Sequence, residues 1–159
     1  MNLILALDIG TSEIKVALFN ENLKLLLIKN IKNKVAYTKE GNSELDMNLL
    51  WKTCVTLINK ILNKKLIKNN KIIGVGITAN MVGLWPINKN GIPVRKAILW
   101  NDLRTLKILD KIFSKDKKIY EKIFKESGSV LQYGCTIPLI KCITDIINVV
   151  AIDSSLNRL

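Results

Sequence analysis

The N-terminal part of the chain alternates short apolar runs with polar turns. Residues 3–7 form a continuous apolar run that stops at Asp8 and Gly10. The apolar residues at positions 14, 16 and 18 then alternate with Lys, Ala and Phe at positions 15, 17 and 19, which is a period of two. The first pattern predicts a strand buried on both faces, and the second predicts a half-buried strand. Residues 23–31 predict a third strand, so the tight turns between these runs indicate an antiparallel meander.

A helical pattern follows the predicted meander. From residue 50 to residue 62, apolar side chains recur at spacings of three and four, which is one face of a 3.6-residue period. Either Asp46 or Asn48 can cap the N-terminus of this helix. We therefore expect a helix over residues 48–67.

The middle of the chain returns to extended patterns. Residues 72–78 predict another buried strand, within which Gly74 and Gly76 suggest the close approach of a neighbouring backbone. Residues 83–88 continue as extended chain, and residues 89–91 supply a turn.

Helices dominate the remainder. After a short strand at residues 97–100, either Asn101 or Asp102 caps a helix whose apolar residues have helical spacing. Further helix is expected around residues 119–124 and over residues 138–149, with a proline in the first turn of the last helix. The order β-β-β-α-β-β-β-α-α-α predicts an α/β fold, a mixed β-sheet flanked by helices.

The composition fits one globular domain. The chain has 159 residues, of which 48% are hydrophobic, with only 3 Pro and 8 Gly, so it can bury a core. It carries 25 basic and 13 acidic side chains, a net charge of +12, which is the one feature that favours a nucleic-acid-binding protein. The lysines follow a general bias toward Ile, Lys and Asn and are spread over several elements. We therefore expect no nucleic-acid partner.

Several kinds of site are excluded by residue type. The chain has no His, which excludes His-based triads and His metal sites. Cys54, Cys135 and Cys142 are odd in number and lack C-x-x-C spacing, which argues against a disulfide framework or a thiolate zinc site and favours a reducing, cytoplasmic location. Asp8 comes too early for a signal peptide, and charges interrupt the apolar stretch 137–152, so no membrane partner is expected.

A carboxylate, a glycine turn and a cation come together near the N-terminus. Asp8 ends the first predicted strand, Gly10, Thr11 and Ser12 follow in a turn, and Lys15 lies three residues further on. One carboxylate suffices for Mg²⁺, which keeps much of its hydration, and a glycine turn with hydroxyls can donate to phosphate oxygens. The lysine adds a point charge. This pattern indicates a triphosphate and magnesium site or, alternatively, a polar hairpin turn alone.

A second group of motifs lies between residues 74 and 105. It contains Asn80-Met81-Val82-Gly83, then Asn90-Gly91-Ile92-Pro93, then Ala97-Ile98-Leu99-Trp100-Asn101-Asp102-Leu103-Arg104-Thr105. In order and spacing these motifs resemble the N-terminal domain of the FGGY carbohydrate kinases, the xylulokinase, gluconokinase and glycerol kinase group of the actin-like ATPase superfamily. Two further segments are similar to this family, namely the opening residues and the predicted helix start with Asp46 and Trp51. The resemblance extends to about residue 143.

The resemblance implies an actin-like ATPase (ribonuclease H-like) fold and a role for each matching residue. ATP and Mg²⁺ would be bound by Asp8, Gly10, Thr11, Ser12 and Lys15, with Asp8 as the magnesium carboxylate. The sugar or polyol would be contacted by Asn80, Met81 and Val82, with Trp100, Asn101 and Asp102 in the same pocket. For Asp102 an alternative stays open, namely a helix cap with a local ion pair to Arg104.

The chain departs from the family pattern in two respects. Asn80 stands in place of a Gln, and Val82 in place of the His that many pentulose kinases carry, so the preferred sugar is open because valine cannot hydrogen-bond a hydroxyl. Members of the family are also about three times as long, with two domains closing on a cleft. We therefore expect residues 1–159 to be a truncated N-terminal, sugar-binding domain, without the C-terminal nucleotide-binding domain and without the Asp that serves as general base.

The leading hypothesis is thus the N-terminal part of an ATP-dependent kinase that phosphorylates a hydroxyl of a sugar or polyol, with a pentulose such as xylulose favoured. The chain alone is expected to have little activity. Its partners would be the small-molecule substrate and a separately encoded C-terminal kinase domain, and exposed interface leaves a homodimer open. The alternative is a non-catalytic remnant or interaction module with the same fold.

Overall fold

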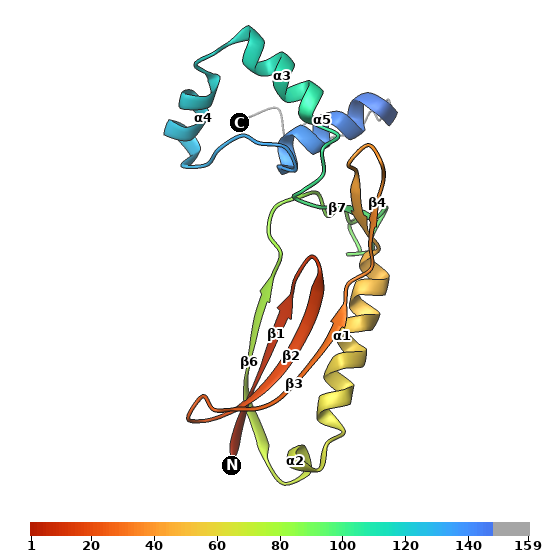
Figure 1. Cartoon of the computed structure of the whole chain (residues 1–159), viewed down its shortest axis with the longest axis vertical. Coiled ribbons are helices and arrows are strands. Elements are labelled where there is room, and N and C mark those ends of the chain that lie inside the picture. The colour runs from red at the N-terminus through yellow and green to blue at the C-terminus, as the bar shows by residue number, and fades with distance from the viewer. Residues whose placement is uncertain (148–159) are drawn as a thin grey trace. The chain divides into compact units, whose positions relative to one another are not determined.

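The computed structural model describes residues 1–147 of the chain. These residues form two compact units, labelled by their elements in Figure 1. The first unit consists of Met1–Ala36, Glu44–Met81 and Pro86–Ala97, and the second of Tyr37–Ser43, Val82–Trp85 and the described residues from Ile98 onward. No helix within residues 1–147 is long and apolar enough to cross a membrane.

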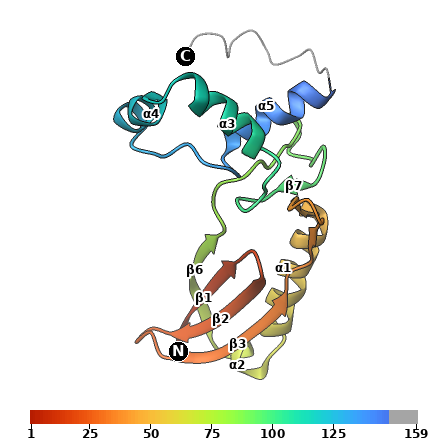
Figure 2. The same cartoon turned by 45° about the horizontal axis from the view of Figure 1, so that its top comes forward.

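The first unit contains a mixed four-stranded sheet. Its strands are β1 (Asn2–Ile9), β2 (Glu13–Asn20), β3 (Leu25–Lys32) and β6 (Lys71–Ala79), in the order β3-β2-β1-β6 (Figure 2). β1 pairs antiparallel with β2, and β2 antiparallel with β3, which confirms the predicted meander. β6 pairs parallel with β1, so the prediction of a mixed sheet is also confirmed.

Helix α1 (Met47–Leu62) runs beside β2 and β3 (Figure 1). The Asp46 side chain caps it by accepting the N–H groups of residues 48 and 49. The predicted continuation to residue 67 is wrong, because Asn63 caps the C-terminus and Lys64 turns to extended backbone, with ψ of 146°. A separate short helix, α2 (Lys65–Lys68), follows.

The core of the first unit lies between α1 and one face of the sheet. It is formed by Leu3, Leu5, Leu7, Ile14, Val16, Leu18, Cys54, Leu57 and Ile61. Leu3, Leu5 and Leu7 of β1 are buried there, whereas Ile4 and Ala6 on the opposite face are partly exposed. The prediction that β1 is buried on both faces is therefore wrong, since the core against α1 takes only one of its faces.

Strand β6 is present where it was predicted, but its burial was predicted wrongly. Ile73, Val75 and Ile77 are 53%, 59% and 68% exposed. A Cβ added at Gly74 or Gly76 would meet no atom within 4 Å, so these glycines do not serve a close backbone contact. The cause is position, because β6 is the edge strand of the sheet and has a neighbour on one side only.

Three short strands, β4 (Val35–Tyr37), β5 (Ser43–Leu45) and β7 (Ala97–Ile98), form a second sheet in the order β4-β5-β7. The sequence pattern did not predict β4 or β5, because three residues are too few to show a period. The strand predicted over residues 97–100 is shortened to the two residues of β7.

The segment at residues 83–88 is not a regular strand. It contributes only isolated bridges, at Leu84 and Ile87. The turn predicted after it is confirmed, since the Gly91 N–H donates to the carbonyl of Asn88 at 2.9 Å and Gly91 has a φ of 75°.

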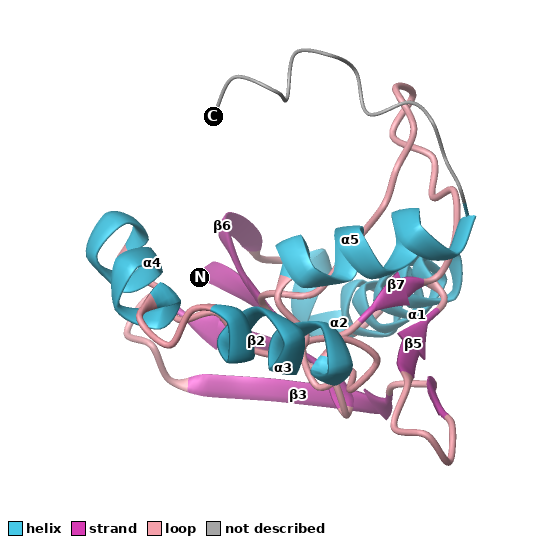
Figure 3. Ribbon diagram, turned by 90° about the horizontal axis from the view of Figure 1, so that it is seen from above, coloured by secondary structure: helices cyan, strands magenta, loops and turns pink. Residues whose placement is uncertain are grey.

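The second unit contains the helices α3 (Leu106–Lys115), α4 (Ile119–Ser127) and α5 (Thr136–Ile147), shown in cyan in Figure 3. All three were predicted, and Pro138 lies in the first turn of α5 as expected. The last two residues of the predicted C-terminal helix, 148 and 149, lie outside the described residues.

The predicted cap of α3 is wrong. Its N-cap is Thr105, which makes no side-chain capping bond, rather than Asn101 or Asp102. The Asp102 carboxylate is used elsewhere, as described below, and a turn separates it from the helix.

Candidate functional site

The turn between β1 and β2 is tight and requires glycine. The Gly10 N–H donates to the carbonyl of Glu13 at 3.0 Å. A Cβ on Gly10 would lie 2.8 Å from that same carbonyl oxygen, closer than Cβ atoms approach oxygen. Thr11 and Ser12 at the tip are thereby held between the ends of two antiparallel strands, as the sequence predicts.

The Asp8 carboxylate is accessible at the end of β1. Asp8 and Lys15 are cross-strand partners in the β1–β2 ladder, with Nζ 3.9 Å from Oδ2 and side chains that are 50% and 45% exposed. Lys15 also lies 3.5 Å from the Glu13 carboxylate. Solvent weakens such exposed ion pairs, so Lys15 does not lock Asp8 and the carboxylate can accept a further cation.

Asn80 connects the end of β6 to this turn. Because β1 and β6 run parallel, with Asp8 beside Thr78, their carboxyl ends meet at the same edge of the sheet. The Asn80 N–H donates to the carbonyl of Ile9 at 2.9 Å, and its Nδ2 donates to the Thr11 hydroxyl oxygen at 3.2 Å. The structure therefore brings Asp8, Thr11 and Asn80 together at one end of the first unit.

Beyond Asn80 the backbone takes unusual conformations. Met81 is 77% exposed. Val82 has a φ of 67°, in the left-handed region that a β-branched residue rarely occupies, and such strain is concentrated at functional sites. The following Gly83 has a φ of 93°, and a Cβ there would lie 2.4 Å from the carbonyl oxygen of Ile98.

Val82 lines a cavity of about 340 Å³ within the second unit. The other walls come from the C-terminal half of α4, the loop after it and the start of α5: Ile123, Ser127, Ser129, Val130, Leu131, Cys135, Thr136 and Ile137. The Thr136 hydroxyl donates to the carbonyl of Gly83 at 2.6 Å and so ties α5 to the loop that carries Val82.

Trp100 and Asn101 also belong to the second unit. Trp100 is 47% exposed, and its carbonyl lies so close to Gly134 that a Cβ there would be 1.7 Å from the oxygen. The Asn101 Oδ1 atom is buried and has no hydrogen-bond partner within residues 1–147. Buried acceptors are normally paired, so this atom is a candidate ligand contact.

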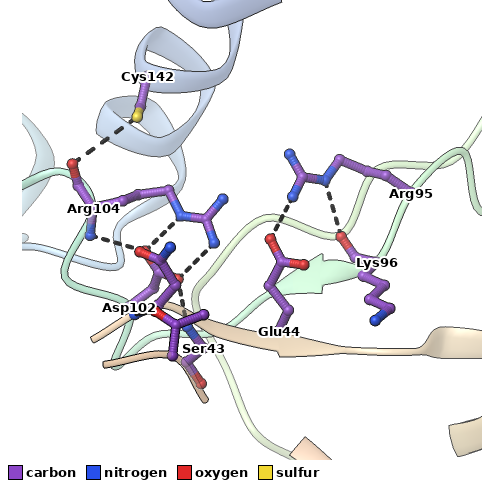
Figure 4. A network of polar contacts seen from close by, with 9 residues as sticks. Ser43, Glu44, Arg95, Lys96, Asp102, Arg104 and Cys142 are labelled. Atoms are coloured by element: carbon purple, nitrogen blue, oxygen red, sulfur yellow. Dashed lines mark hydrogen bonds and ion pairs between the residues drawn. The ribbon is translucent and has the colours of Figure 1, made fainter. Parts of the chain in front are cut away.

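Asp102 has a different environment. It is fully buried, and its oxygens accept the Ser43 N–H at 2.7 Å and the Arg104 Nε at 2.7 Å and Nη2 at 2.9 Å (Figure 4). The Arg104 backbone N–H donates to the same carboxylate at 3.0 Å. The local ion pair that the sequence offered as an alternative is therefore present, and a role of Asp102 toward a substrate stays a prediction.

The predicted site residues thus divide between the units. Asp8, Gly10, Thr11, Ser12, Lys15, Asn80 and Met81 lie in the first unit, and Val82, Trp100, Asn101 and Asp102 lie in the second. Within residues 1–147 no three His, Cys, Asp or Glu side chains gather into a metal cluster. The carboxylates beside the turn are those of Asp8 and Glu13, which share Lys15.

Asn33 also belongs to this region, although the sequence did not predict it. It follows β3, and it contacts the carbonyls of both Gly10 and Ser12. Nothing in the pattern distinguishes it from the many other Asn residues of the chain, since its role depends on the pairing of β2 with β3.

Comparison with known proteins gives a consistent family. The model of the FGGY family of carbohydrate kinases, N-terminal domain, matches residues 3–148. A glycerol kinase of Mycoplasma pneumoniae is 36% identical over 127 residues, which is 79% of this chain and 25% of that protein. A xylulose kinase of Staphylococcus xylosus is 30% identical over 138 residues, 87% of this chain and 28% of that protein.

Solved structures agree on the fold. The crystal structure of Plasmodium falciparum glycerol kinase with ADP matches with a TM-score of 0.80 at 23% identity, covering 91% of this chain and 29% of that chain. Xylulose kinase from Rhodospirillum rubrum matches with a TM-score of 0.82 at 14% identity, covering 92% and 30%. These are kinases of the actin-like ATPase fold, and the present chain spans between a quarter and a third of their length.

Proposed function

The chain belongs to the FGGY family of carbohydrate kinases, and on that premise we propose that it is the N-terminal part of an ATP-dependent kinase for a sugar or polyol hydroxyl. The reaction would transfer the γ-phosphoryl group of ATP to that hydroxyl. Such transfer depends on positioning and on stabilising charge, which requires a phosphate site next to an acceptor site.

One observation carries this proposal, the hydrogen bond from Asn80 Nδ2 to the Thr11 hydroxyl at 3.2 Å. It joins the first residue of the proposed acceptor loop to the tip of the proposed phosphate turn. Phosphoryl transfer needs its two reactants within reach of each other, and a direct contact between the two loops supports that arrangement.

Asp8 is the proposed magnesium ligand. Its carboxylate is half exposed, beside the turn, and it lies among no larger carboxylate cluster within residues 1–147. That fits Mg²⁺, which commonly takes one or two protein carboxylates and leaves the rest of its coordination to phosphate and water. When bound, the ion would neutralise charge on the phosphates.

The remaining phosphate contacts are proposed for the turn and its cation. Gly10, Thr11 and Ser12 offer backbone N–H groups and two hydroxyls, and Lys15 offers an ammonium that is 45% exposed. Lys15 is shared between Asp8 and Glu13, so its release from these carboxylates would accompany phosphate binding.

On the acceptor side we propose Asn80, Met81 and Val82, together with Trp100 and Asn101. The orphan Oδ1 of Asn101 supports this assignment, because a buried acceptor without a partner gains from a ligand hydroxyl. The strained φ of Val82 supports it as well. A pentulose such as xylulose is the first substrate to test, with glycerol next, since the similar proteins include xylulose kinases and glycerol kinases.

Residues 1–159 are proposed to act as the sugar-binding domain, with a nucleotide-binding domain supplied by further polypeptide. The chain spans 25% and 28% of the lengths of the two kinases compared above, which supports this. We also propose a cytoplasmic location, since the three cysteines of the chain are odd in number and lack C-x-x-C spacing. Self-association is proposed through the exposed edge strand β6.

Calorimetric titration of the chain with Mg·ATP, and separately with xylulose and glycerol, tests the proposal. We expect ATP to bind only in the presence of Mg²⁺. We expect this binding to weaken by about tenfold or more in Asp8→Asn, because the substitution removes the charge that faces the ion. Asp110→Asn, an exposed carboxylate in α3, serves as the matched control and should bind as the unsubstituted chain does. Equal binding by Asp8→Asn would contradict the assignment.

A second candidate function is a non-catalytic module that keeps the fold. The valine at position 82, which cannot hydrogen-bond a hydroxyl, favours it. The same titrations separate the two, because a remnant would bind neither Mg·ATP nor the acceptor.

A further inference from the structure

Asn33 makes two hydrogen bonds to the turn between β1 and β2 and a third to its neighbour Lys34. Its backbone N–H donates to the carbonyl of Ser12 at 2.9 Å, and its side-chain Nδ2 donates to the carbonyl of Gly10 at 3.1 Å. Its Oδ1 accepts the N–H of Lys34 at 3.0 Å. The last bond fixes which way the amide faces, because an amide turned by 180° would set an oxygen against the Gly10 carbonyl.

These bonds determine the direction of two peptide groups. In a trans peptide group the C=O and the following N–H point in opposite directions. Since Asn33 draws the carbonyls of Gly10 and Ser12 to its own side, the N–H groups of Thr11 and Glu13 are directed to the other side. The turn is thereby polarised, with its oxygens toward Asn33 and two N–H groups away from it.

We propose that Asn33 is a positioning residue that keeps this turn in the orientation that receives phosphate, an inference that rests on the proposed function. Anion-binding turns work by presenting N–H groups and hiding carbonyls. Asn33 contacts no phosphate in this scheme. It acts through the backbone of Gly10 and Ser12.

The Gly10–Thr11 peptide is the sensitive element. The Ser12 carbonyl accepts the backbone N–H of Asn33, a bond that is kept in any substitution other than proline. The Gly10 carbonyl accepts the side-chain amide of Asn33, a bond that a substitution removes. Glycine has the freest backbone of all residues, so without that bond the peptide can rotate and present its carbonyl to the phosphate oxygens.

The test compares Asn33→Ala and Asn33→Asp with Asn20→Ala as control. Asn33→Asp is isosteric but cannot donate to the Gly10 carbonyl when ionised. Asn20 makes comparable bonds, accepting the N–H groups of Asn22 and Lys24 at 3.0 and 2.9 Å. It lies at the opposite end of β2, seven residues or about 23 Å from Glu13.

Two quantities are measured on the full chain: the order parameter of the Thr11 N–H by NMR relaxation, and the affinity for Mg·ATP by calorimetry. Both Asn33 variants should lower the order parameter at Thr11, because the Gly10–Thr11 peptide gains freedom, and should weaken Mg·ATP binding about tenfold, the scale of one lost hydrogen bond. Asn20→Ala should leave both unchanged. Folding of each variant is checked by circular dichroism, and the isosteric Asn33→Asp carries the test if the alanine variant unfolds.

Three other outcomes would each overturn a stated part of the proposal. An unchanged order parameter at Thr11 in the Asn33 variants overturns the positioning role alone. Equal weakening of binding by Asn20→Ala overturns it as well, because the effect would then be one of general stability. Absence of both Mg·ATP and acceptor binding by the unsubstituted chain overturns the proposed function, and with it the phosphate role of the turn that Asn33 holds.

Discussion

Two aspartates to which the sequence gives site roles, Asp8 toward magnesium and Asp102 toward the sugar, have opposite environments in the folded chain. Asp8 is half exposed at the end of a strand, and its neighbour Lys15 is 3.9 Å away. Asp102 is fully buried and pairs with Arg104, whose side chain is 14% exposed. The two residues look alike in sequence because a motif records residue type and spacing but not the solvent around a carboxylate.

Asp102→Ala is expected to destabilise the second unit strongly. The change leaves the Arg104 guanidinium and the Ser43 N–H without their shared acceptor in a buried place, which typically costs about 3–5 kcal/mol. Urea unfolding followed by circular dichroism measures this, with Asp110→Ala as an exposed control that should change stability by less than about 0.5 kcal/mol. Unchanged stability together with lost acceptor binding would instead assign Asp102 to the ligand.

Asn33 and Asn80 show why part of the site could not be predicted from residues alone. The motif with Asn80 was visible, yet its bond to Thr11 follows from the parallel pairing of β6 with β1. Asn33 lies in no motif, and its contact with Gly10 exists because β3 returns beside β2. Long-range pairing sets these contacts, and local periodicity carries no information on it.

At the scale of elements, a clear apolar pattern was sufficient to predict that a helix or strand exists, but not where it ends or how exposed it is. β1 was predicted from a continuous apolar run, β2 from alternation, and the start of α1 from its capping residue. The end of α1 was placed too late because apolar residues continue beyond the helix. The exposure of β6 could not be predicted, since an edge strand and a central strand have the same apolar run and differ only in their neighbours.

The junction between α3 and α4 offers a prediction about pH. Asp116 accepts the Lys122 ammonium at 2.8 Å and the Lys118 N–H at 2.9 Å, and these bonds, the Lys122 bond foremost, hold the pKa of the Asp116 carboxyl below its usual range. The bond to Asp116 likewise raises the pKa of Lys122. A lowered carboxyl pKa stabilises the fold at pH values above the carboxyl pKa of the unfolded chain, which is about 3.9. This stabilisation is lost as the pH falls through the lower pKa of the folded chain.

NMR titration of the Asp116 carboxyl measures that pKa directly. Lys122→Ala should raise it toward the ordinary value, because the largest cause of the shift is removed. Lys125→Ala, an exposed lysine of the same helix, should leave it in place. An equal effect of both substitutions would mean that the shift comes from net charge and not from the bond.

At the scale of the whole molecule, the net charge and the order of the motifs lead to different conclusions. The net charge of +12 is a property of composition, and it did not indicate what the chain is related to. The order of three motifs along the chain did, because a shared order reflects a shared fold. The family match over residues 3–148 agrees with that interpretation, and the fold agrees with structures at 14–23% identity.

Catalysis requires more groups than binding does, so we expect the isolated chain to bind Mg·ATP without transferring its phosphoryl group. Transfer requires both reactants and a base that takes the acceptor proton, and the chain spans about a quarter of the length of the glycerol kinase compared above. A coupled assay of ADP release with xylulose, gluconate and glycerol should therefore show no rate above that of Asp8→Asn, even where calorimetry detects Mg·ATP. Turnover well above that variant would mean that the base lies within these 159 residues, and would direct attention to the few acidic side chains outside the proposed site.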